Sequence, residues 1–272
     1  MNTLDPKLLR DVLSSSLPSA LGTLHVNYRY LLGWSQAMSA RRPGMRLLDF
    51  GCGPGQVVEA AMTLGLDARG VDVFYAGEKD REEVAARGLL GTLVREIRDG
   101  RIPFDDATFD LVVSNQVFEH VEDLDGTLSE VRRVMRPDGL LVALFPTREV
   151  VREAHCGVPF LHWRPRGGRL AHALRWSRWG TGFEKEKKSA EEWAREATAW
   201  VDRYVFYRTR SETLRSFGKG FDVAPAEEHY LAYRLPWRPL APLLRVPWAR
   251  EGSRLVCRRF NGAVLTARKR PS

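Results

Sequence analysis

The chain has 272 residues, 44% hydrophobic and 28% charged, a composition typical of one globular domain with a large insertion or an added subdomain. It holds no apolar run long enough to span a bilayer, and Cys52, Cys156 and Cys257 are too few and too scattered for a disulfide framework or a zinc site. The first residues lack a basic segment followed by a hydrophobic stretch, so we expect no secretory signal and predict a reducing, cytoplasmic setting.

The net charge of +8 is unevenly distributed along the chain. Residues 1–150 hold 17 Lys and Arg against 22 Asp and Glu, a net charge of −5, whereas residues 151–272 hold 25 against 12, a net charge of +13. Seven of the eight tryptophans also follow residue 150. A basic, aromatic half suits an anionic molecule, an acidic carrier, a membrane surface or nucleic acid. An arginine-rich solvated surface explains the same charge without a partner, and the sequence leaves both explanations open.

Two helices are predicted before the first strand. Residues 5–16 form the first, because Asp5 suits an N-cap and Pro6 suits the first turn. Apolar spacing predicts the second over residues 21–39, which carries Tyr28 and Tyr30. We favour a core position for both tyrosines over a role at a ligand.

The run from Leu47 to Gln56, Leu-Leu-Asp-Phe-Gly-Cys-Gly-Pro-Gly-Gln, predicts the end of a buried strand, a glycine-rich turn and the start of a helix. Glycines let a backbone turn sharply and approach a ligand closely, and a helix N-terminus adds free N–H groups. The glycines at 51, 53 and 55 alternate with other residues, and Gln56 stands where a dinucleotide fingerprint has its third glycine. The spacing therefore disfavours a nicotinamide dehydrogenase, and a P-loop is excluded by the missing Lys-Ser/Thr ending.

The run Leu48-Asp49-Phe50-Gly51-Cys52-Gly53-Pro54-Gly55 resembles the first motif of class I S-adenosylmethionine (SAM)-dependent methyltransferases, in particular the methyltransferase type 11, or ubiquinone-biosynthesis-like, group. The resemblance implies that the glycine loop lies beside the methionine part of SAM. It also implies that Asp49 is tied to the amino group of SAM, and that the N-terminal helices, residues 1–40, form a lid.

A second acidic residue ends the next predicted strand, residues 68–74. Asp72 follows the glycine loop by about 20 residues, a position from which a carboxylate can accept hydrogen bonds from both ribose hydroxyls of a nucleotide. A helix N-cap is the alternative role for Asp72, and the spacing favours the ribose. We expect the neighbouring Val73 to contact the cofactor as well.

Residues 99–121 read DGRIPFDDATFDLVVSNQVFEHV and resemble a second block of the same methyltransferases. The resemblance implies that Asp99 and Gly100 meet the adenine, although Arg98 stands where many relatives carry the acidic residue. Asn115 and Gln116 follow the predicted strand 111–114, at the edge where open α/β sheets bind ligands. His120 comes just after them. We favour a local structural role for this histidine, with a general base as the alternative.

Strands and helices alternate up to residue 146, which predicts a parallel, doubly wound sheet. The resemblance implies an α/β fold with a Rossmann-like seven-stranded, mostly parallel sheet and helices on both faces, with the seventh strand antiparallel between the fifth and the sixth. Further elements are predicted as helices at 78–87, 123–135 and 211–218, a turn at 136–139, and strands at 91–97, 140–145, 221–223 and 262–267.

The chain is divided into four parts: a helical lid (1–40), a SAM-binding core (41–147), an inserted basic, Trp-rich helical and loop subdomain on the substrate side (148–205), and the completion of the sheet with a Pro/Trp-rich insertion (206–272). Prolines between residues 236 and 248 argue against a long helix there.

The insertion leaves the carboxyl end of the fifth strand, where methyl acceptors usually bind in the resembled family. His155 and His162 are candidate bases there, and Arg148, Arg152 and Arg164 could hold an anionic group. A structured loop with histidines bonded to the backbone is the alternative for each of these residues.

The resemblance implies methyl transfer from SAM to an oxygen or nitrogen of a small-molecule, glycan, lipid or carrier-bound acceptor, which the basic half favours as anionic. His155 and His120 are the catalytic candidates, and no metal site is predicted.

Nucleic acid is disfavoured, because no DNA amino-methylation motif follows the fourth strand and no RNA-binding module is visible. Peripheral membrane contact by the Trp/Pro/Arg segment is one alternative location, and a SAM-binding scaffold without catalysis is the alternative function. The predicted cofactor contacts are Asp49, Gly51, Cys52, Gly53, Gly55, Gln56, Asp72, Val73, Asp99, Gly100, Asn115 and Gln116.

Overall fold

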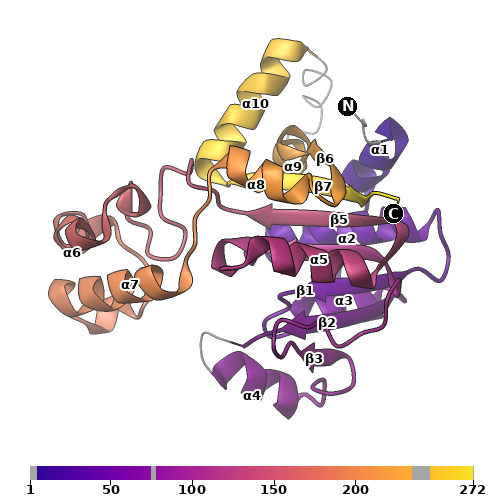
Figure 1. Cartoon of the computed structure of the whole chain (residues 1–272), viewed down its shortest axis with the longest axis horizontal. Helices are drawn as coiled ribbons and strands as arrows, with labels where there is room; N and C mark the ends of the chain where they lie inside the picture. Colours follow the sequence, from indigo (N-terminus) through magenta and orange to yellow (C-terminus); the bar gives the residue numbers. More distant parts are fainter. Residues whose placement is uncertain (1–4, 75–77, 235–245, 272) are drawn as a thin grey trace.

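The structure is a computed structural model that describes residues 5–74, 78–234 and 246–271 (Figure 1). Its centre is a seven-stranded sheet with the order β3-β2-β1-β4-β5-β7-β6, in which β7 runs opposite to the other six strands. The predicted fold class is confirmed, including the antiparallel strand between the fifth and the sixth. The strands are β1 (Arg46–Phe50), β2 (Asp67–Asp72), β3 (Val94–Glu96), β4 (Phe109–Asn115), β5 (Met135–Phe145), β6 (Phe221–Pro225) and β7 (Ala263–Lys269).

The central strands are apolar on both faces because helices cover both sides of the sheet. Leu48 of β1 pairs beside Val112 of β4, and Val113 pairs beside Val142 of β5. All four side chains are fully buried. Continuous apolar runs are typical of parallel strands covered on both faces, which is why these strands are visible in the sequence.

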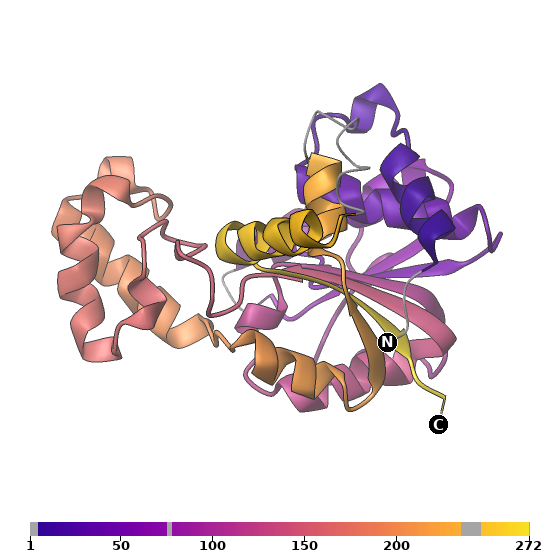
Figure 2. The ribbon, with the colours of Figure 1, turned by 90° about the horizontal axis from the view of Figure 1, so that it is seen from above.

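Two layers of helices enclose the sheet (Figure 2). On one face, α1 (Pro6–Ser14), α2 (Val26–Ser39), α3 (Gln56–Thr63) and α9 (Glu227–Arg234) share one apolar cluster with the sheet. On the other face, α5 (Leu124–Val134) and α8 (Arg210–Phe217) share a second cluster. The remaining helices of this part are α4 (Glu78–Ala86), which follows β2, and α10 (Pro247–Phe260), which packs on α9.

Local hydrogen bonds set where the helices begin. The Asp5 carboxylate accepts from the Lys7 N–H at 2.8 Å, so α1 starts as predicted, although it ends at Ser14. The imidazole of His25 accepts from the Asn27 N–H at 3.3 Å and caps α2. The second helix therefore begins at residue 26 rather than at the predicted residue 21, and residues 19–21 form a separate 3-10 turn.

The turn predicted at residues 136–139 lies inside β5 as a bulge. The pairing of β4 with β5 shifts from Phe109 beside Met135 to Leu111 beside Leu140. Asp138, with φ of 62°, makes the bend within the extra residues. Turn-forming residues mark a bulge here because strand pairing continues on both sides of them.

Two helices project from one end of the sheet and make up most of the insertion after β5 (Figures 1 and 2). These helices are α6 (Arg166–Arg175) and α7 (Ala190–Tyr204), and a capping box of Ser189 and Glu192 starts α7. The insertion has a small core of its own around the fully buried Trp193. It is therefore a packed unit rather than a loose loop.

The Pro/Trp-rich segment is only partly described, since residues 235–245 lie outside the described residues. Pro247 and Trp248 open the 14-residue helix α10, so the expectation that prolines prevent a long helix here is wrong for the end of the segment. Pro247 occupies the first helical turn, where the N–H that proline lacks has no intrahelical partner. Helix α9, just before the undescribed residues, was not predicted.

Candidate functional site

The loop between β1 and α3 is built from glycines in the left-handed region. The φ angle is 77° at Gly51, 48° at Gly53 and 83° at Gly55. A Cβ placed on Gly51 would lie 2.1 Å from Cγ2 of Val117, so no side chain fits there. The loop backbone therefore passes directly against the segment that follows β4.

Asp72, at the end of β2, is bonded to this loop. Its Oδ2 accepts from the Gly53 N–H at 2.8 Å, and its Oδ1 accepts from the Phe74 N–H at 2.8 Å. Each carboxylate oxygen has two lone pairs, so each can still accept a hydrogen bond from a ligand. Asp72 and the glycine loop are thus held together by a hydrogen bond.

Asp49, at the end of β1, is buried beside Asp72. Burial, and secondarily the negative charge of Asp72, raises the pKa of Asp49 to about 8. A buried carboxyl with a raised pKa holds a proton near neutral pH, and a cationic ligand group would draw that proton off. The site therefore favours a ligand that brings a positive charge.

These groups line a cavity of about 980 Å³ at the carboxyl ends of the parallel strands. Three of the predicted cofactor residues do not line this cavity: Gly55 faces Leu89, and Gln56 and Asp99 are exposed to solvent. His155 also lies outside the lining. The predicted site residues that do line the cavity are Asp49, Gly51, Cys52, Gly53, Asp72, Val73, Gly100, Asn115, Gln116 and His120.

The two tyrosines of α2 lie in different environments. Tyr30 is fully buried, as favoured, and its hydroxyl lies 3.0 Å from His229 Nδ1, whereas Tyr28 lines the cavity. Residues two apart on a helix point about 200° away from each other, so the two positions could not share one environment. Sequence reasoning also missed Lys79 and Asp80 of α4, because this helix is mostly polar and Val84, the single buried residue among those described in it, gives no periodic pattern that would show which side faces the cavity.

A second cavity, of about 460 Å³, adjoins the first at the ends of β4 and β5. Asn115 and Gln116 line both cavities. Asn115 Oδ1 accepts from Asn27 Nδ2 at 2.8 Å, and Asn27 Oδ1 accepts from the Tyr230 hydroxyl. Gln116 has φ of 58°, a strained backbone conformation of the kind that gathers at functional sites. Side chains from α2, β4 and α9 thus fix the junction of the two cavities.

Two arginines line the second cavity. Arg152 donates to the carbonyls of Gly157 at 2.6 Å and Trp179 at 3.0 Å, and Arg234 donates to the Tyr230 hydroxyl at 3.2 Å. Because a guanidinium carries five N–H donors, both arginines keep donors for an anionic ligand. The other arginines expected to hold an anionic group, at positions 148 and 164, lie outside this lining.

The two predicted catalytic histidines form one pair. His155 Nε2 lies 3.1 Å from His120 Nε2. His120 Nδ1 donates to the Tyr204 carbonyl at 2.8 Å, and His155 Nδ1 donates to Glu153 Oε1 at 2.8 Å. Because a carbonyl and an ionised carboxylate only accept, both Nδ1 atoms carry hydrogen, and the facing Nε2 atoms need one proton between them. The third candidate, His162, is instead buried against the Arg148 carbonyl, outside both cavities.

Burial lowers the pKa of His120 to about 4, so this ring is neutral near pH 7. Burial alone would raise the pKa of Glu153, but its hydrogen bond to His155, the charge of that ring, the Cys156 N–H and the Tyr207 hydroxyl together lower it to about 2. An ionised Glu153 therefore accepts from His155 Nδ1, beside a neutral His120.

Glu119 adds a buried acid next to this pair. Neither of its carboxylate oxygens has a hydrogen-bond partner within the described structure, and burial raises its pKa well above the usual range. Its Oε1 lies 3.9 Å from His120 Nε2. Glu119, His120 and His155 offer ligand atoms within 4.8 Å of one another, so this carboxylate and two imidazoles have the composition of a metal site where none was predicted.

Known proteins resemble the chain in sequence and in fold. Residues 48–143 match the model of a family described as methyltransferase domain. Ubiquinone biosynthesis O-methyltransferases of Maricaulis maris and Mesorhizobium japonicum are 33% and 32% identical over 143 and 133 residues, which cover 50% and 47% of this chain and 56% and 53% of those proteins. The chain thus spans about half the length of these curated relatives. A SAM-dependent methyltransferase from Mesorhizobium loti superposes with a TM-score of 0.48 and 19% identity, over 86% of this chain and 96% of that one.

Proposed function

Residues 48–143 are a class I methyltransferase domain with SAM as its cofactor, and from this premise we propose that the chain transfers a methyl group from SAM to a hydroxyl oxygen of a small-molecule acceptor. The observation that carries the proposal is the junction at Asn115 and Gln116, where a second cavity opens beside the cofactor cavity. Oxygen is preferred to nitrogen because the relatives at 33% and 32% identity are named O-methyltransferases.

The first cavity fits SAM in its polar groups. Asp72 keeps lone pairs for both ribose hydroxyls, and the raised pKa of Asp49 suits a carboxyl that meets the cationic amino group. The absence of a side chain at Gly51 lets the loop backbone come close. When bound, SAM supplies a methyl carbon on a positively charged sulfur, and transfer forms the oxygen–carbon bond as the carbon–sulfur bond breaks.

The second cavity is the proposed acceptor site. Arg152 and Arg234 hold an anionic group of the acceptor, carboxylate or phosphate, through charge-assisted hydrogen bonds. Asn115 and Gln116 stand between this group and the cofactor cavity, so they orient the acceptor oxygen toward it. Alignment and exclusion of water are the main tasks left to the protein, because the methyl group is already activated.

The His120–His155 pair is the proposed base. The pair acts as a base after it has released the shared proton to solvent: the two Nε2 lone pairs then face each other at 3.1 Å, the proton of the acceptor hydroxyl takes the place between them as the oxygen–carbon bond forms, and it is released to solvent before the next turnover. His120 lines the cofactor cavity and receives the proton, whereas His155 lies behind it. Glu153 borders the second cavity, but its carboxylate accepts from His155 Nδ1 and from the Tyr207 hydroxyl, so Glu153 and Tyr207 act as positioning residues that fix the ring of His155.

Calorimetric titration with SAM and S-adenosylhomocysteine tests the proposal, with Asp72→Ala as the matched variant. We expect binding of about micromolar affinity that the variant loses by at least about 100-fold, since two hydrogen bonds to a charged group disappear. Release of S-adenosylhomocysteine is then measured with hydroxylated aromatic carboxylates and phosphates as acceptors. No binding by the native chain would refute the proposal, and binding without turnover on any acceptor would point to a SAM-binding scaffold.

A further inference from the structure

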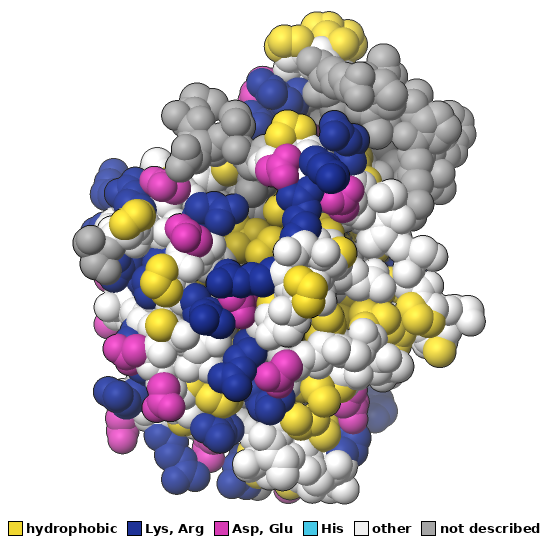
Figure 3. Space-filling model, turned by 90° about the vertical axis from the view of Figure 1, so that its right-hand side faces the viewer, with side chains coloured by type: hydrophobic (Ala, Val, Ile, Leu, Met, Phe, Trp, Pro, Cys, Tyr) yellow, Lys and Arg dark blue, Asp and Glu magenta, His cyan; other side chains and the backbone are white. Residues whose placement is uncertain are grey.

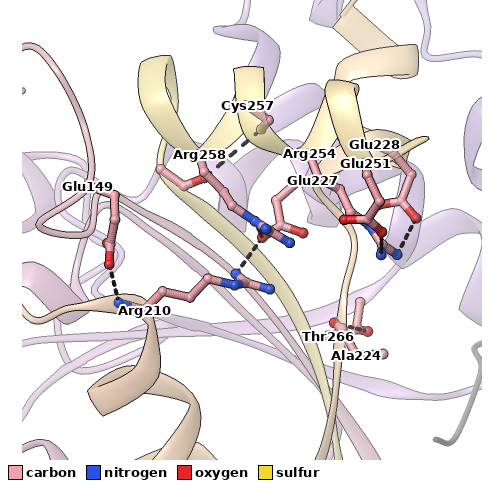
Figure 4. A network of polar contacts seen from close by, with 11 residues as sticks. Glu149, Arg210, Ala224, Glu227, Glu228, Glu251, Arg254, Cys257, Arg258 and Thr266 are labelled. Atoms are coloured by element: carbon pink, nitrogen blue, oxygen red, sulfur yellow. Dashed lines mark hydrogen bonds and ion pairs between the residues drawn. The ribbon is translucent and has the colours of Figure 1, made fainter. Parts of the chain in front are cut away.

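Helix α10 turns its charged side toward the protein (Figure 4). Arg254 donates to both oxygens of Glu228 of α9, from Nη2 at 2.7 Å and from Nε at 2.9 Å. Arg258 donates to the fully buried Glu227 at 3.1 Å, and Arg210 of α8 donates to the same oxygen at 2.5 Å. Ion pairs of low exposure thus hold α10 against α9, and Arg210 of α8 pairs with the same Glu227.

The outward side of the same helix is apolar. Trp248 is 78% exposed, Leu255 55% and Val256 48%, and their spacing of seven and eight residues places them on one face. Phe260, at the end of the helix, is 70% exposed. These four make up half of the large apolar side chains that stand out to solvent in the described part of the chain.

This arrangement is the reverse of an ordinary surface helix. Helices of water-soluble domains place the apolar stripe on the core and the charges in water. Contiguous apolar surface that faces water marks a site of contact with another apolar body. The outward face of α10, defined by Trp248, Leu255 and Val256, is therefore a candidate for such a contact.

We propose that this face lies on an anionic lipid surface. A helix of 14 residues is about 21 Å long and about 10 Å wide, so its outward side offers roughly 200–300 Å², well below the roughly 800 Å² per partner of a stable protein interface. Arg259, exposed on the same side, and the net charge of +13 after residue 150 complement anionic headgroups.

Figure 3 shows Lys and Arg side chains, with acidic side chains among them, over the face seen from the right of Figure 1, and apolar side chains at the top. Among the described residues, no helix combines the length and the apolar character needed to cross a bilayer. Helix α10 therefore lies along the interface, with its apolar side chains among the headgroups and upper acyl chains.

The position of Phe260 links this surface to the proposed acceptor site. Phe260 lines the second cavity and is also largely exposed at the end of α10. An acceptor with an apolar tail would reach the cavity from the lipid surface past this ring. This last step rests on the proposed function, whereas the contact with lipid does not.

Co-sedimentation with vesicles tests the contact. The full chain is mixed at low salt with vesicles of phosphatidylcholine containing about 30% phosphatidylglycerol, or of phosphatidylcholine alone. We expect binding to the anionic vesicles that falls at least about 10-fold in the double variant Trp248→Ser/Leu255→Ser and weakens with salt. Trp179→Ser, which removes an exposed tryptophan from the insertion, is the matched control and should bind like the native chain.

Three results would overturn the proposal: no binding of the native chain to anionic vesicles, equal loss in the double variant and the control, or equal binding of the native chain and the double variant. A concentration-dependent dimer that the double variant alone abolishes would also overturn it, in favour of a second copy of the chain. Titration with SAM in the absence of vesicles is run on every variant, so that failure of the cofactor site is separated from failure of lipid contact.

Discussion

The two cavities are built in different ways. The cofactor cavity is made by short segments that end neighbouring parallel strands: the glycine turn after β1, Asp72 of β2 and Asn115 of β4. The second cavity, which is the proposed acceptor site, combines side chains far apart in the chain, such as Asn27 of α2, Arg152 after β5 and Arg234 of α9. The first cavity is therefore largely a local product of strand and turn, whereas the second depends on long-range packing.

The largest expected effect is a loss of methyl transfer to the acceptor without a loss of cofactor binding. His155→Ala should lower kcat for a hydroxyl acceptor by about 10²–10⁴-fold, the usual contribution of a general base, with SAM affinity unchanged. The double variant with His120→Ala should be little worse than His155→Ala, because the two rings act as one unit. Steady-state kinetics and calorimetry on the same preparations measure both quantities.

His172→Ala is the control, since this imidazole of α6 bonds to the Pro159 carbonyl outside both cavities. A normal rate in His155→Ala, or additive losses in the double variant, would contradict the paired base. Tyr207→Phe removes one hydrogen bond to Glu153 and should change the pH profile of the rate more than SAM affinity, as a positioning role requires.

The next effect concerns the anion site. Arg234→Gln should raise KM for an anionic acceptor by roughly 10–100-fold, since hydrogen bonds to charged groups contribute about 1.5–3 kcal/mol. SAM affinity and KM for an uncharged analogue should stay within about 2-fold, because Arg234 does not line the cofactor cavity. Arg178→Gln, an exposed arginine of the insertion, is the control. An equal rise in KM for charged and uncharged acceptors would show that the cavity does not select by charge.

A smaller effect concerns the protonation of Asp49 in the cofactor cavity. The pKa of Asp49 is raised to about 8 from an unfolded value near 3.8, so its contribution to the stability of the ligand-free protein is present below about pH 4 and is lost as pH rises through about 8. Asp49→Asn should remove this decline, so denaturant unfolding at about pH 6 and about pH 8.5 should differ less for the variant. SAM affinity should rise with pH in the native chain and stay flat in Asp49→Asn. A flat profile in the native chain would contradict the assigned protonation.

The smallest expected effect is that of metal removal. A chelator should leave the rate unchanged if a proton joins His120 and His155, because no ion is then needed between them. Loss of activity that zinc or magnesium restores would instead assign Glu119 and the two histidines as metal ligands. Metal analysis of the purified protein accompanies the assay.

The same difference between the cavities explains what the sequence could predict. The apolar runs of the buried strands, the three glycines and the acid at the end of β2 are local patterns, and they predict the sheet and most of the first cavity. Neither the pairing of His120 with His155 nor the place of Tyr230 beside Asn27 has a local signal, because each joins elements distant in sequence. Helix α10 was missed because proline was taken as a breaker, whereas at the first turn it begins a helix.

One feature of the insertion bears on how such proteins could change their acceptors. Where the chain leaves α7, two main-chain atoms form hydrogen bonds to the segment after β4. The Tyr204 carbonyl accepts from the His120 imidazole, and the Phe206 N–H donates to the Glu119 carbonyl at 2.7 Å. Backbone atoms make both contacts on the side of the insertion, so the identity of its side chains at 204 and 206 is not constrained by them. Neither contact therefore prevents the replacement of helices α6 and α7. A graft that keeps residues 148–157, which carry Arg152 and His155, and the backbone path at residues 204–206 would leave the histidine pair and the glycine turn in register.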